Sequence, residues 1–73
     1  MTKQSLHFRT ELCEFDRLGN VEQLRAMAVL VLVEENAKFV EISEADGNKN
    51  VLLIASYDPR RGGVDKDFVF ATP

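Results

Sequence analysis

Two arginines followed by two glycines, Arg60-Arg61-Gly62-Gly63, form the stretch whose residue types and spacing come closest to a ligand site. Guanidinium groups bind phosphates and carboxylates through paired hydrogen bonds, so Arg60 and Arg61 could hold an anionic ligand. Glycine-rich phosphate loops lead into the N-terminus of a helix, whereas this stretch leads into residues 66–71, which have the composition of a short strand. The sequence therefore implies no P-loop, and a solvated hairpin loop is the simpler interpretation.

The single histidine, His7, and the single cysteine, Cys13, have no partners in the sequence that would give them a catalytic or metal-binding role. His7 falls on the polar side of an expected strand, where a solvated histidine is the ordinary case. Cys13 has no C-x-x-C neighbour, and an inert, partly buried thiol is the default for such a residue. Since no base, nucleophile and stabilising group belong together, we expect no enzyme activity, no metal and no cofactor.

A second group of oxygen-bearing side chains, Asp46, Asn48 and Asn50, has the first three spacings of a calcium-binding loop. Val51 stands at the sixth place, where such a loop needs glycine, and Tyr57 stands at the twelfth, where glutamate binds the ion. The match fails where the geometry is strictest. Because Asp46 is followed by glycine, the same residues indicate a tight hairpin turn.

The size and charge of the chain limit the kinds of protein it can be. It has 73 residues, 45% of them hydrophobic and 29% charged, with a net charge of −3, which predicts one small domain over residues 1–73. The mild acidity disfavours a nucleic-acid-binding protein, because such domains are usually basic. The apolar run at residues 26–33 is too short to cross a bilayer as a helix. With one cysteine and no secretory signal, we expect a cytoplasmic protein.

Alternating polar and apolar side chains predict strands at residues 5–15 and 38–44, and two further strands are expected at residues 49–57, which answer the second strand across a turn, and at residues 66–71. Between the second and third of them, Asp46-Gly47 predicts a type I′ hairpin turn, because both central residues of that turn need a positive φ. This turn would place Ile42 opposite Val51 in an antiparallel pair.

The apolar run decides the architecture, because it can be interpreted as a strand or as a helix. As a strand at residues 26–34, its three valines and two leucines alternate in a way that suits a pleated surface. As a helix it would be apolar nearly all round, which suits a larger core than this chain offers. We therefore predict a mainly β (α+β) fold, a small antiparallel meander of about four or five strands with one short helix near residues 20–25. The alternative is a β-α-β-β-β fold with a helix at residues 20–36.

In the strand interpretation both faces of the sheet are apolar, and too little chain remains to cover both. One of these faces would hold Leu30, Leu32, Phe39, Leu52 and Ile54. Antiparallel sheets normally have one solvated face, and a contiguous exposed apolar patch usually marks an interaction surface. We therefore expect a non-enzymatic protein-interaction module that docks an apolar sheet face or a strand edge onto a protein partner. That partner is another copy in a homo-oligomer, or a larger protein for which the chain is an inhibitor, adaptor or assembly subunit.

The alternative function uses the arginine loop. A small β-barrel could bind single-stranded nucleic acid or another anionic ligand through Arg60 and Arg61, with Tyr57 or Phe68 stacking on a base. The acidic balance of the chain and the burial expected for most of its aromatic residues weaken this alternative.

Overall fold

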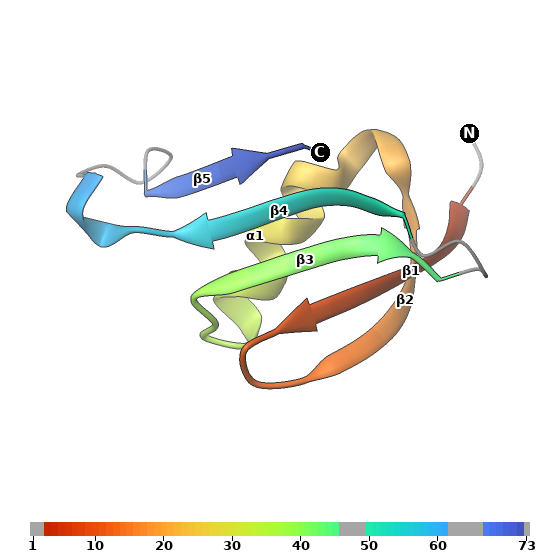
Figure 1. The fold of residues 1–73 in the computed structure, drawn as a ribbon, viewed down its shortest axis with the longest axis horizontal. Coiled ribbons are helices and arrows are strands. Elements are labelled where there is room, and N and C mark those ends of the chain that lie inside the picture. Colours follow the sequence, from red (N-terminus) through yellow and green to blue (C-terminus); the bar gives the residue numbers. More distant parts are fainter. Residues whose placement is uncertain (1–2, 46–49, 62–66, 73) are drawn as a thin grey trace.

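The computed structural model describes residues 3–45, 50–61 and 67–72, which form a five-stranded antiparallel sheet with one helix on one of its faces (Figure 1). In chain order these residues form β1 (Lys3–Thr10), β2 (Glu14–Asn20), the 3₁₀ turn η1 (Val21–Gln23), α1 (Leu24–Glu34), β3 (Phe39–Glu44), β4 (Val51–Tyr57), the 3₁₀ turn η2 (Pro59–Arg61) and β5 (Phe68–Ala71). The mainly β, antiparallel fold with one helix is thus confirmed.

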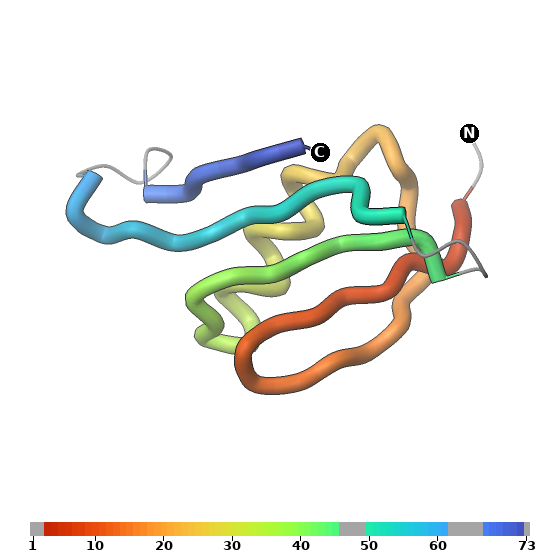
Figure 2. Tube along the Cα trace, viewed as in Figure 1, coloured from red at the N-terminus to blue at the C-terminus, as the bar shows by residue number. Residues whose placement is uncertain are grey.

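The strand order is β2-β1-β3-β4-β5, so β2 and β5 are the two edges of an open sheet (Figure 2). Strand β3 pairs with β1 and not with β2, because α1 carries the chain back across the sheet before β3 begins. The described strands do not close into the barrel of the alternative function. An open sheet leaves one free hydrogen-bonding side on each edge strand.

The apolar run of residues 26–34 is helical, so the strand predicted there is wrong, and the alternative of a helix at residues 20–36 is closer to the structure. Asn20 starts this segment, since its side-chain oxygen accepts a hydrogen bond from the backbone N–H of Glu22 at 3.0 Å. The strand preference of valine amounts to about 1 kcal/mol or less, and packing overrides it. Here the sheet has one apolar face to cover, and α1 buries Ala28, Val31 and Leu32 against it.

Helix α1 ends in a Schellman motif that turns the chain toward β3. Asn36 has a φ of 51°, in the left-handed region that asparagine tolerates better than most residues. The backbone N–H of Ala37 donates to the carbonyl of Leu32 at 3.0 Å, and that of Asn36 donates to the carbonyl of Val33 at 3.3 Å. These bonds satisfy carbonyls that the last helical turn leaves without partners.

The N-terminal third contains a hairpin, whereas the sequence predicts one strand at residues 5–15. Its turn contains neither glycine nor proline and is closed by a hydroxyl instead. The Oγ1 of Thr10 accepts hydrogen bonds from the backbone N–H groups of Leu12 and Cys13, both at 3.0 Å. Gly19 lies within β2, where a Cβ atom would collide with the end of the Met27 side chain, so the strand can pass close beneath α1.

The hydrophobic core lies between α1 and the sheet face that it covers. The buried apolar residues are Leu6, Phe8, Ala28, Val31, Leu32, Ala37, Val40, Ile42, Leu53 and Ala55. Strands β3 and β4 pair with Ile42 opposite Leu53, so the predicted pairing of Ile42 with Val51 is wrong, and the register shifts just after Ile42. The predicted Asp46-Gly47 turn lies outside the described residues.

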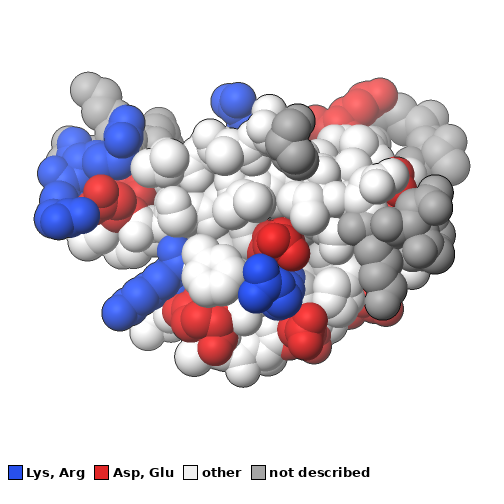
Figure 3. Space-filling view, viewed as in Figure 1, with Lys and Arg blue, Asp and Glu red and all other residues white. Residues whose placement is uncertain are grey.

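The opposite face of the sheet is solvated and of mixed polarity, so the prediction of two apolar sheet faces is wrong. Charged groups of both signs lie among uncharged ones on it (Figure 3). Near its middle, Arg9 on β1 and Glu41 on β3 form an ion pair with an N–O distance of 3.2 Å. Two of the apolar side chains that the sequence assigned to one sheet face, Leu30 and Leu32, belong to α1 instead.

Candidate functional site

Helix α1 is apolar on the side that faces away from the sheet as well as on the side that packs against it. Arg25 and Glu34 are its two charged residues. Leu30 is 51% exposed and Val33 is 65% exposed. Helical spacing aligns these two with Ala26 and Val29 in one apolar row. A surface helix normally carries polar side chains there, so the row is available to cover another apolar surface.

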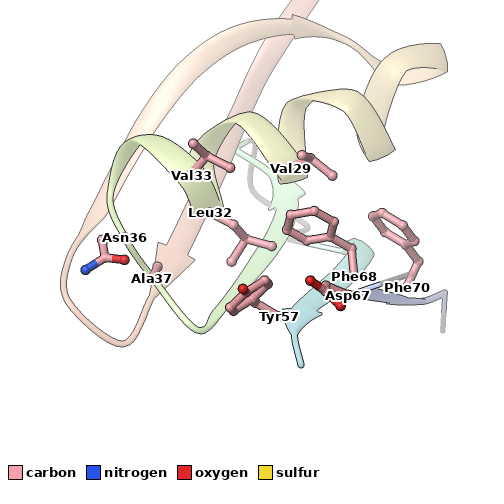
Figure 4. Close-up of a pocket in the computed structure, with 9 residues that line it drawn as sticks. All are labelled: Val29, Leu32, Val33, Asn36, Ala37, Tyr57, Asp67, Phe68 and Phe70. Carbon is pink, nitrogen blue, oxygen red and sulfur yellow. The ribbon is translucent and has the colours of Figure 1, made fainter. Parts of the chain in front are cut away.

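A groove runs beside this row, between α1 and the strands β4 and β5 (Figure 4). It has a volume of about 670 Å³ and is lined by Val29, Leu32, Val33, Asn36, Ala37, Tyr57, Asp67, Phe68 and Phe70. The groove exists because α1 packs mainly on β3 and β4, while β5 lies beyond its cover. Pockets of about 300–1,000 Å³ with mostly apolar walls are the usual size for ligand binding.

Aromatic rings from β4 and β5 form the wall of the groove opposite α1. The ring centroids of Tyr57 and Phe68 are 5.5 Å apart, and Tyr57 is 42% exposed. The guanidinium carbon of Arg25 lies 5.2 Å from the centroid of the Phe70 ring, a cation–π contact between α1 and β5. We call this ring wall, together with the apolar row of α1 (Ala26, Val29, Leu30 and Val33), the α1–β5 surface.

The structure does not bring together the five residues predicted to form one binding face. Leu30 lies on the exposed row of α1, whereas Leu32 is buried and reaches the groove from the core side. Phe39 and Ile54 lie on the solvated sheet face, and Leu52 packs against the core. They separate because a strand has two faces, whereas a helix distributes the same side chains around its axis.

Sequence reasoning missed most of the residues of the α1–β5 surface. Val29, Val33, Phe68 and Phe70 belong to it, and their contact depends on the placement of α1 beside β5. One signal was present, namely a run that would be apolar nearly all round as a helix. In a small domain that pattern indicates a helix with an exposed apolar side, and not only an unfavourable helix.

Arg60 and Arg61 lie in η2, immediately after β4. The Nε of Arg60 donates a hydrogen bond to Oδ1 of Asp58 at 3.1 Å, and the backbone N–H of Arg60 donates to the same oxygen at 3.1 Å. The hydrogen bond from the Arg60 side chain holds the pKa of Asp58 below its usual value. A neighbouring carboxylate thus engages one of the two predicted anion-binding side chains.

His7 lies on the solvated sheet face between two carboxylates. Its Nδ1 is 2.7 Å from Oδ1 of Asp16, and its Nε2 is 3.1 Å from Oε1 of Glu14. These hydrogen bonds raise the pKa of His7, that with Asp16 first and that with Glu14 second. Ser43 stands opposite His7 on β3, but carboxylates engage both ring nitrogens, so His7 is not arranged to activate a serine. Within the described ranges no group of three or more His, Cys, Asp or Glu residues could hold a metal ion.

Comparisons with known proteins add no family to these observations. No family model, curated protein or solved structure matches the chain. In the part of the chain that the structure describes, no helix has the length and apolar character needed to cross a membrane.

Proposed function

We propose that this chain is a non-enzymatic protein-interaction module that binds its partner through the α1–β5 surface. The observation that carries the proposal is the exposure of Leu30, Val33 and Tyr57 around an apolar groove in a chain of 73 residues. Contiguous apolar patches of this kind mark interaction sites, because covering them removes apolar area from water at a gain of about 25 cal/mol per Å².

The groove also offers a free strand edge beside its apolar wall. Among the described strands β5 pairs with β4 alone, and its Phe68 and Phe70 line the groove. A partner that adds a strand to β5 would gain backbone hydrogen bonds and place side chains in the groove at the same time. The mode predicted from the sequence, docking of a face or an edge, is kept in this proposal, but the face is the exposed side of a helix.

Replacement of Leu30 and Val33 tests the proposal. We expect the wild-type chain to bind a hydrophobic fluorescent dye or to associate at micromolar concentration, and the Leu30→Lys plus Val33→Lys variant to lose both properties. Leu18→Lys is the matched control, because Leu18 is 68% exposed on β2, away from the groove. Far-UV circular dichroism verifies that each variant folds. A wild-type chain that is monomeric and binds no dye would contradict the proposal.

Anion binding through Arg60 and Arg61 is the second candidate function. It is supported by the exposed ring of Tyr57, which lies two residues before the turn that carries the arginines. A fluorescence anisotropy titration with a single-stranded oligonucleotide at low and moderate salt tests it. Binding that is unchanged in the Arg60→Ala plus Arg61→Ala variant would exclude it.

A further inference from the structure

The two edges of the sheet differ in how well they are protected against pairing with another chain. Strand β2 carries Glu14, Asp16 and Arg17 among its seven residues. Strand β5 has the sequence FVFA, with no charge and no proline. Charged residues and prolines on edge strands normally prevent edge-to-edge association, so β5 is the unprotected edge.

From this contrast we infer that the chain forms a twofold-symmetric dimer in which β5 pairs antiparallel with β5 of a second copy. The inference rests on the proposed function and names the partner as a second copy of the chain. With the twofold axis at Val69, Phe68 stands opposite the partner's Phe70, and Val69 stands opposite the partner's Val69. Directly opposite residues of an antiparallel pair share a face, so the four phenylalanine rings lie in one row on the side of α1.

Charge complementarity favours a second copy as the occupant of this edge. Two charged side chains of opposite sign flank the rings, Arg25 over Phe70 and Asp67 just before Phe68. Antiparallel pairing reverses the order of these features in the second copy. In this register the partner's Asp67 stands opposite Ala71, next in the chain to Phe70, so Arg25 and the partner's Asp67 lie at the same end of the paired strands with opposite charges. The twofold symmetry repeats this pairing of opposite signs on each side of the axis.

The proposed dimer also explains why the groove is open in the single chain. Both copies of α1 lie on the same face of a continuous sheet, one on each side of the row of rings. Each groove then opens toward the axis, where the rings of the other copy can enter it. The side of β5 that faces away from α1 carries Val69 and Ala71, so no charged side chain of β5 obstructs the pairing there.

Charge substitution at the axis tests the dimer. In Val69→Lys two lysines would stand directly opposite each other, and in Val69→Glu two glutamates would. We expect sedimentation equilibrium to show a wild-type dimer and a dissociation constant raised by about tenfold or more in each variant. An equimolar mixture of the two variants should dimerise again, because unlike charges then meet. This recovery also shows that both variants fold.

The control and the alternative outcomes separate this inference from the proposed function. Leu18→Lys places the same charge on the other edge strand and should leave the dimer unchanged. Dimers that persist in both Val69 variants, or a mixture that fails to recover, would overturn the β5 pairing. A wild-type monomer that still binds dye through Leu30 and Val33 would also overturn it, and would leave the proposed function in place with a larger protein as the partner.

Discussion

His7 is the side chain whose charge depends most clearly on its neighbours. Its solvated position agrees with the prediction from strand alternation. Its two carboxylate partners were not predictable, because Glu14 and Asp16 oppose β1 only once β2 is recognised as a strand. That strand was missed since the turn before it is closed by the hydroxyl of Thr10, which leaves no glycine or proline signal.

The raised pKa of His7 predicts a small dependence of stability on pH. The folded chain holds the proton more tightly than the unfolded chain, whose histidine has a pKa near 6.5. The stabilisation is therefore complete below about pH 6.5 and is lost as the pH rises through the higher folded value. We expect it to be less than about 1 kcal/mol, because the His7 side chain is 35% exposed and surface ion pairs are screened.

Urea unfolding of the wild type and of His7→Gln measures this contribution. Between pH 6 and pH 8 the free energy of unfolding should fall more in the wild type than in the variant, and high salt should reduce the difference. The variant is the control for the wild type, because His7 is the single histidine of the chain and its replacement removes the histidine titration in that range. Equal pH dependence of the two proteins would contradict the role given to Glu14 and Asp16.

Among the elements, α1 shows where sequence reasoning succeeded and where it stopped. The fold class was predictable because the alternation in residues 38–44 and the turn residues that follow them need no tertiary information. The secondary structure of residues 26–34 was not, since valine and leucine differ by less than about 1 kcal/mol between helix and strand. Residues 26–34 become a helix because the sheet has an apolar face that a helix can cover, and this face exists only in the folded chain. The candidate site was missed for the same reason, because it lies between α1 and β5.

The left-handed conformation of Asn36, at the end of α1, leads to a prediction about stability. Asn36→Ala should lower the free energy of unfolding by about 1 kcal/mol, because alanine tolerates the left-handed conformation less well than asparagine. Asn36→Gly should leave stability unchanged or raise it, since glycine adopts a positive φ without a steric penalty. Urea denaturation of the two variants provides the measurement. If both substitutions destabilise the chain equally, the left-handed conformation at this position is not the cause.

At the scale of the whole molecule, the sequence indicates more apolar side chain than a chain of this size can bury. In the structure, part of this excess is exposed on the α1–β5 surface, at Leu30, Val33 and Tyr57, and the rest is exposed elsewhere, at Leu12, Leu18, Val21 and Ile54. The chain thus uses one helix for two purposes, since one side of α1 completes the core and the other remains exposed.

The proposed dimer couples stability to concentration. Because the dimer dissociates when it unfolds, a tenfold rise in protein concentration adds about 0.7 kcal/mol per chain to the free energy of unfolding. For a domain of this size we expect the Tm to rise by roughly 3–6 °C. Differential scanning calorimetry at several concentrations gives the measurement, with Val69→Lys as the control whose Tm should stay constant at concentrations below its raised dissociation constant. A wild-type Tm that is independent of concentration would argue against the dimer.

The close passage of Gly19 beneath Met27 has a consequence for how this sequence can change. A side chain at position 19 would occupy the volume that the end of Met27 now fills, so the two positions are not free to vary independently. In a library randomised at both sites and selected for folding, larger residues at position 19 should be recovered together with smaller ones at position 27. The pair would thus appear as a covarying couple that links β2 to α1, although neither residue belongs to the surface proposed for binding.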